Sequence, residues 1–110
     1  MSKPQRATST DKPAPRLYDM DKVIIDLKNN PLQVEGKDLT IGDAIVSVLV
    51  ANTPGEGNGK QKLDRYQLGV RLNEGGPQPL THEEIVLIKE LIAKPYGPIV
   101  VGQVYEALEN

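Results

Sequence analysis

The stretch from Thr81 to Glu109 constrains the fold most, because it predicts two helices separated by a proline hinge. Thr81 and Glu84 fit a capping box, in which each side chain accepts a hydrogen bond from a backbone N–H in the first turn. Pro95 ends the first helix, since proline lacks a donor and disfavours helical geometry in the residue before it, and Pro98 suits the first turn of the second. The apolar residues at helical spacing are Ile85, Leu87, Ile88, Leu91 and Ile92, then Val101, Val104, Tyr105 and Leu108. The stretch therefore predicts a helical hairpin.

Residues 40–51 predict a buried central helix. Thr40 is its expected cap, and Asp43 stands at the third helical position in the acidic form of the capping box. The segment is apolar nearly all round, which is typical of a helix that is covered on several sides. Its β-branched residues leave a strand from Ile45 to Val50 as the competing assignment. The cap and the length favour the helix.

Residues 60–73 predict a further helix with a basic outer surface. Leu63, Tyr66 and Val70 lie on one side, and Leu68 and Leu72 lie on a neighbouring side. Tyr66 is expected in the core because it shares its side with two aliphatic residues. Gly69 lowers helix propensity and is expected to permit close packing with a neighbour. The basic residues of the outer surface are Lys60, Lys62, Arg65 and Arg71.

The N-terminal half predicts a short antiparallel hairpin from Val23 to Glu35. Its apolar residues alternate with polar ones on both sides of the turn signal at residues 29–31. Residues 36–38 are expected to form a second turn. A two-stranded hairpin is marginal alone, so one face should lie on the helices. The expected fold is mainly α, in the α+β class, with this hairpin packed on about four helices.

Length and composition indicate one domain with an arm in front of it. The chain has 110 residues and an aliphatic core composition, without Phe or Trp. Without cysteine it can form no disulfide and no thiolate metal site, which fits a reducing compartment. We find no signal-peptide pattern and no apolar run long enough to span a bilayer, so we expect a soluble protein. Residues 1–18 are expected to be a flexible arm, and residues 19–110 a single globular domain.

The charge is unevenly distributed between these two parts. Residues 1–18 carry four basic residues, including Arg16, and one acidic residue, which gives a net charge of +3. The rest of the chain carries nine basic and fourteen acidic residues, a net charge of −5. The basic arm could contact phosphates or an acidic protein surface. The plainer interpretation is a solvated leader.

The sequence predicts no enzyme, no cofactor and no metal site. His82, the only histidine, lies at a helix start without a nucleophile or a convergent carboxylate in its pattern. The glycine-rich segment 52–59 lacks the Ser or Thr of a phosphate loop, because Gln61 follows Gly59-Lys60. The basic helix could bind nucleic acid weakly through phosphates, but the acidic body argues against a duplex-binding domain.

Protein interaction is the remaining class, and four residues are its candidates. Tyr96 stands in the proline hinge, and tyrosine is enriched in interfaces because it joins apolar area to a polar tip. Arg65 and Lys62 provide charge on the basic helix, and Arg16 provides it on the arm. A space-filling role in a core without Phe or Trp is the alternative for Tyr96.

Four runs together resemble a group of small proteins encoded by tailed bacteriophages and prophages. They are LTIGDAIVSVLV, KQKLDRYQLGVRL, LTHEEIVLIKELI and PIVVGQVYEALE, and the resemblance covers roughly residues 35–109. It implies a viral origin and action in the bacterial cytoplasm or in the virion. Two functions are then open: an interaction protein that binds a phage or host protein, and a head or tail accessory protein whose arm lies over a neighbour. The resemblance transfers no functional residue.

Overall fold

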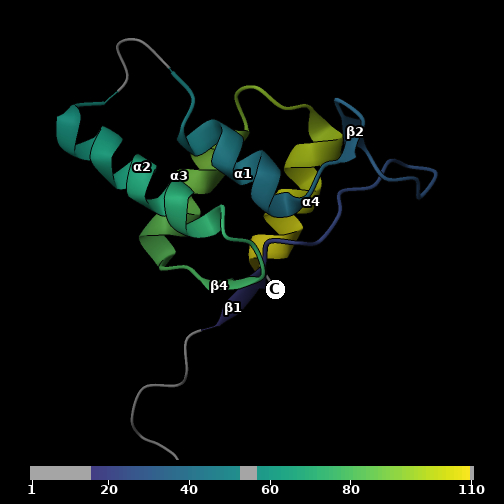
Figure 1. Cartoon of the computed structure of the whole chain (residues 1–110), viewed down its shortest axis with the longest axis horizontal. Coiled ribbons are helices and arrows are strands. Elements are labelled where there is room, and N and C mark those ends of the chain that lie inside the picture. Colours follow the sequence, from purple (N-terminus) through teal and green to yellow (C-terminus); the bar gives the residue numbers. More distant parts are fainter. Residues whose placement is uncertain (1–15, 53–56, 110) are drawn as a thin grey trace, which may run out of the picture.

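The computed structural model of the protein describes residues 16–52 and 57–109. Four helices make up most of this part of the chain: α1 (Ile41–Leu49), α2 (Gly59–Leu72), α3 (His82–Ile92) and α4 (Pro98–Glu109). Short strands lie before α1 and between α2 and α3: β1 (Leu17–Asp19), β2 (Gln33–Val34) and β3 (Lys37–Asp38), then β4 (Pro77–Pro79). The predicted mainly helical α+β class is therefore confirmed (Figure 1).

Local sequence signals set the helix boundaries. Thr40 and Thr81 cap α1 and α3 in complete capping boxes with Asp43 and Glu84, as predicted. A third capping box, between Asn58 and Gln61, starts α2 one residue before the predicted boundary. The hinge is also confirmed, since α3 ends at Ile92 and α4 begins at Pro98.

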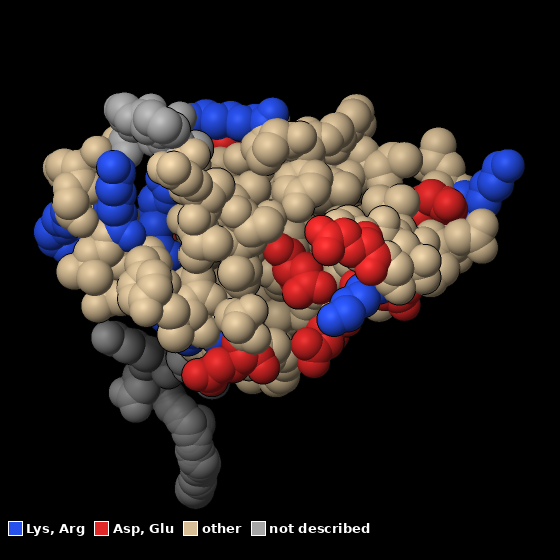
Figure 2. Space-filling model, turned by 45° about the horizontal axis from the view of Figure 1, so that its top comes forward, with Lys and Arg blue, Asp and Glu red and all other residues tan. Residues whose placement is uncertain are grey.

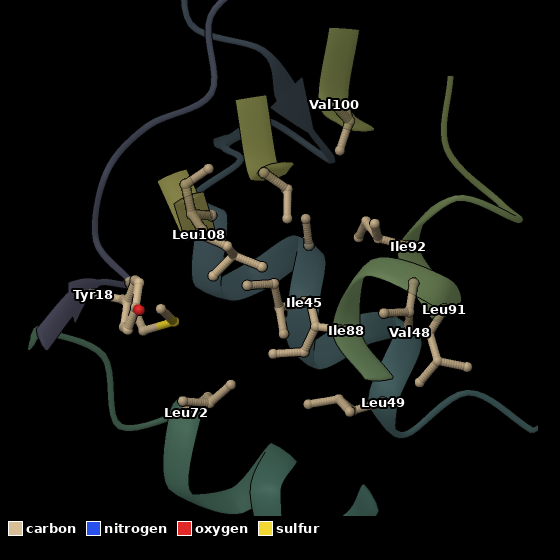
Figure 3. Close-up of a cluster of buried hydrophobic side chains, with 14 of the residues drawn as sticks. Tyr18, Ile45, Val48, Leu49, Leu72, Ile88, Leu91, Ile92, Val100 and Leu108 are labelled. Atoms are coloured by element: carbon tan, nitrogen blue, oxygen red, sulfur yellow. The ribbon is translucent and has the colours of Figure 1, made fainter. Parts of the chain in front are cut away.

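Helix α1 is the centre of the core, as its all-round apolar sequence predicted. It contacts α2, α3 and α4, and its residue Ile45 has no exposed surface. Figure 3 shows side chains from the other helices and from β1 gathered around it. The competing strand assignment for Ile45 to Val50 is wrong, because the capping box and the packing on three sides hold the segment as a helix.

Strands β1 and β4 pair antiparallel, with Tyr18 opposite Gln78. The side chain of Tyr18 is 9% exposed and belongs to the core. The predicted arm of residues 1–18 therefore extends two residues too far, since Leu17 and Tyr18 are part of the domain. Residues 1–15 of that arm lie outside the described part of the chain.

The β-hairpin lies later in the chain than predicted. Strands β2 and β3 pair around a turn at Glu35 and Gly36, which have φ angles of 53° and 82°. The predicted second turn at residues 36–38 is thus wrong for Lys37 and Asp38, which form β3. The predicted turn before Pro31 also exists. An antiparallel bridge pairs Ile25 with Pro31, and on either side of it the Asp26 N–H donates to the Asn30 carbonyl and the Leu32 N–H donates to the Ile24 carbonyl. The predicted pairing across this turn is therefore present, but it is short.

Candidate functional site

The outer face of α2 carries an exposed apolar surface. Leu63, Tyr66 and Val70 are 51%, 61% and 49% exposed. The expectation that Tyr66 lies in the core is therefore wrong. Helix α2 buries its other side, with Arg65, Leu68, Gly69 and Leu72 facing inward. Residues about half a turn away from that side must face solvent.

Val50, just beyond the end of α1, extends this surface. It is 54% exposed, and its Cγ1 atom would lie 2.9 Å from a Cβ atom at Gly69. Gly69 thus permits the close packing that its position predicted. Val50 and Tyr66 also line one shallow hollow of about 270 Å³ between the two helices. We call the four residues Val50, Leu63, Tyr66 and Val70 the α2 patch.

Helix α2 lies at one end of the molecule, on the left in Figure 1. Its main contact with another helix is with α1. One long side of α2 is therefore free of the rest of the described domain, and the α2 patch occupies that side.

Arg65 is buried, although the sequence predicted it on the basic outer surface. It is 7% exposed. Its Nε donates to the carbonyl of Leu49 over 3.1 Å, and its Nη2 donates to the carbonyls of Val48 (3.1 Å) and Ala51 (3.5 Å). Val48 and Leu49 are the last residues of α1, so their carbonyls lack partners within the helix and carry the negative end of its dipole. Arg65 is therefore a cap for α1, and a partner cannot use its charge.

Lys62 is exposed as predicted, and it lines the same hollow as Arg65 and Tyr66. Lys60 lies near it on α2 and forms an exposed ion pair with Asp64 at 3.2 Å. Figure 2 shows Lys and Arg atoms gathered at the end of the molecule where α2 lies, and Asp and Glu atoms over its centre and lower edge. The α2 patch is therefore bordered by the exposed Lys62 and by the Lys60–Asp64 pair.

Tyr96 is only half-buried and packs against the core from the hinge between α3 and α4. Its hydroxyl lies 3.0 Å from Ser47 Oγ. Ser47 donates its own proton to the Ala44 carbonyl over 2.7 Å, so Tyr96 is the donor in the pair. The predicted interface residue thus ties the hinge to α1.

Arg16 lies in a third place, away from α2. Its Nη1 donates to the carbonyl of Glu109 over 3.4 Å, and its guanidinium stands 5.1 Å from the centre of the Tyr18 ring. The structure thus brings together only two of the four candidates, Lys62 and Arg65, and only Lys62 of those two is accessible.

A polar cluster between α2 and α3 was not found from the sequence. Arg71 Nη2 donates to the Pro79 carbonyl over 2.8 Å and to Glu84 Oε1 over 3.0 Å. Glu84 Oε1 also accepts the Thr81 N–H in the capping box. The cluster borders a cleft of about 480 Å³. Its bonds join α2, β4 and the start of α3, so its evident role is to hold these elements together.

No group of side chains in the described part of the chain has the make-up of a metal site. His82 is exposed at the first position of α3. Within residues 16–52 and 57–109, no cluster of three or more His, Asp or Glu side chains could hold a metal ion. None of the helices in these ranges is long and apolar enough to cross a membrane.

Comparisons with protein-family models, with curated proteins and with solved structures found no match to this chain.

Proposed function

We propose that this protein is a non-enzymatic interaction domain that binds a protein partner through the α2 patch. One observation carries the proposal: Leu63, Tyr66 and Val70 are exposed along one side of α2, and Val50, at the end of α1, lies beside them. Removing such area from water is favourable by about 25 cal/mol per Å². Contiguous exposed apolar surface on a soluble domain commonly marks an interaction site.

The charged residues next to the α2 patch indicate which kind of partner it would bind. Lys62 stands exposed beside the apolar residues, so acidic groups on a partner would be attracted to this surface. Leu63, Tyr66 and Val70 follow the i, i+3, i+7 spacing of a helix that packs along its length against another. An acidic amphipathic helix fits both features.

The α2 patch supports protein binding better than nucleic-acid binding. Phosphate recognition needs a cluster of accessible basic groups. Arg65 is buried, and Lys60 and Arg71 are already paired with Asp64 and Glu84. An apolar surface with few available cations favours a protein.

The resemblance to tailed-phage proteins suggests where that partner belongs. A phage or bacterial host protein, in the bacterial cytoplasm, is the proposed partner. The second candidate is a role as a head or tail accessory protein, in the virion. Mass spectrometry of purified phage particles distinguishes the two, because an accessory protein stays with the particle and a host-directed binder does not.

Capture from infected and uninfected bacterial extracts tests the α2 patch. Leu63→Asp places a charge in the patch without changing the core, because Leu63 is 51% exposed, so the variant should fold normally and no longer capture the partner. Leu27→Asp is the matched control, because Leu27 is 90% exposed and lies outside the patch. If Leu63→Asp captures the same proteins as the wild type, the proposed site is wrong.

A purified probe tests the partner chemistry directly. We expect a synthetic acidic amphipathic helical peptide to bind more tightly than the same peptide with its Glu residues replaced by Lys. Lys62→Glu should weaken binding of the acidic peptide. The effect should be larger at low salt, because high salt screens the attraction between exposed charges. Equal binding of both peptides would contradict the charge argument.

A further inference from the structure

Leu27 is the most exposed large apolar side chain in the described part of the chain, and a rigid turn presents it. It is 90% exposed. Asp26 holds the turn, because its Oδ1 accepts the N–H groups of Lys28 and Asn30 over 2.8 and 3.0 Å. The Asp26 N–H donates to the Asn30 carbonyl, and Asn29 has a φ angle of 66°. The turn is ordered by its own bonds, so it holds Leu27 out in water without support from a neighbour.

Gln103 of α4 fixes this turn on the body of the domain. Its Oε1 accepts the Ile25 N–H over 3.0 Å, and its Nε2 donates to the Ile25 carbonyl over 2.6 Å. The amide thus occupies the backbone edge of Ile25, where another strand could otherwise pair. The position of Leu27 relative to α4 is therefore defined.

A groove of about 610 Å³ lies between this segment and α4. Its apolar lining comes from two elements that are far apart in the sequence: Val23, Ile25 and Leu27 on one side, and Pro98, Ile99 and Gly102 on the other. We call these six residues the Leu27 groove.

Gly102 is unexplained by the fold of the single chain. It lies inside α4, where glycine is less stable than alanine, and it is exposed. A Cβ atom at this position would meet no other atom within 4 Å. By contrast, Gly42 and Gly69 are in tight contact with Met20 and Val50. The surface of α4 at Gly102 is therefore open, and a side chain of another molecule can approach the helix there.

The charges around the Leu27 groove are balanced in sign. Lys22 and Lys28 are exposed, and Asp26 and Glu106 line the groove with Lys22. A surface that binds a copy of itself needs this balance, because every charge meets the same surface in the partner. The border of the α2 patch is less balanced, because Lys62 stands there beside the Lys60–Asp64 pair.

We propose that the Leu27 groove is a homodimer interface, in which Leu27 of each copy seats on Gly102 of the other. The projecting leucine and the open glycine lie on one surface, so a two-fold axis between them satisfies both contacts at once. Charges of both signs lie on this surface, since Lys22 and Asp26 both line the groove, so the two copies would not repel each other through a single sign of charge. An interface built on one turn and one helix is small, so the dimer should form in a concentration-dependent manner.

Light scattering and sedimentation of the full chain over a concentration series test the proposal. We expect the mass to rise from that of the monomer, 12.0 kDa, toward twice that value. Leu27→Asp and Gly102→Lys should each weaken the dimer by at least about tenfold, as expected at the centre of an interface. Gly102→Ala, which adds one methyl group, should weaken it less. A wild-type chain that stays monomeric at millimolar concentration overturns the proposal.

Leu63→Asp separates this proposal from the proposed function. Leu63→Asp should abolish partner binding and leave the dimer unchanged. Leu27→Asp should weaken the dimer and leave partner binding unchanged. If Leu63→Asp and not Leu27→Asp makes the protein monomeric, the dimer forms through α2 and the Leu27 groove is excluded.

Cross-linking tests the two-fold geometry itself, and the absence of native cysteine makes the result easy to interpret. A mixture of Leu27→Cys and Gly102→Cys chains should form a disulfide-linked heterodimer under mild oxidation. A mixture of Leu27→Cys and Lys62→Cys chains is the control, because Lys62 lies on α2. Equal cross-linking in the two mixtures contradicts the proposed contact.

Discussion

Gly42 packs directly on the backbone of Met20. The Gly42 N–H donates to the Met20 carbonyl over 2.9 Å, and a Cβ atom at residue 42 would lie 2.9 Å from the same oxygen. No side chain can rotate to relieve that contact, because the neighbour is main chain. The first turn of α1 can therefore approach the segment after β1 only if residue 42 has no side chain.

Gly42→Ala and Gly102→Ala should change stability in opposite directions. Gly42→Ala forces the Met20 backbone away and should cost about 1–3 kcal/mol, as overpacking of a core does. Gly102→Ala meets open space and should stabilise α4 by up to about 1 kcal/mol. Chemical denaturation in dilute solution measures both effects. Equal changes of the same sign would show that the contact at Met20 is not tight.

Arg65→Ala should destabilise the domain by about 2 kcal/mol or more, because buried carbonyls at the end of α1 lose a charged donor. Lys62→Ala removes an exposed cation from the same helix and should change stability by no more than about 0.5 kcal/mol. The free energies of unfolding in urea give the comparison. Similar small effects for both variants would contradict the role of Arg65 as a buried cap of α1.

The Tyr96–Ser47 bond should appear as coupling in a double-mutant cycle. Tyr96→Phe keeps the ring and removes the hydroxyl, so it should cost about 1 kcal/mol or less in the wild type. In a Ser47→Ala background the same change should cost almost nothing, since the acceptor is gone. An equal cost in both backgrounds would mean that the two hydroxyls do not interact.

Removing residues 1–15 should leave the thermal midpoint nearly unchanged, because their sequence contains few apolar groups that could be buried. Removing residues 1–19 should lower it by more than about 5 °C, since Tyr18 is a core residue and β1 pairs with β4. Calorimetry of the two truncated chains measures the difference. A large fall with the shorter deletion would show that residues 1–15 also stabilise the domain.

The helix boundaries could be predicted because local chemistry decides them. The threonines at positions 40 and 81 bond to residues three positions away, and Pro95 and Pro98 restrict the backbone around themselves. Such signals need no knowledge of distant residues. The central place of α1 was also predictable, because a helix with apolar residues all round is stable only when several elements cover it.

The sequence alone determined which segments are helical, where they are capped and that α1 is central. Only the tertiary structure decided which side of α2 is covered, because Leu63 and Leu68 are equally apolar and burial depends on where α1 lies. The same placement buried Arg65 at the end of α1, exposed Tyr66 and paired β1 with β4 across about sixty residues. The position of Leu27 beside Gly102 is also a long-range result, since Gln103 fixes it from the other end of the chain. Local sequence patterns reflect the conformational preferences of one segment and its interaction with water. Burial of Arg65, exposure of Tyr66 and pairing of β1 with β4 depend instead on the interaction between segments that are distant in the sequence.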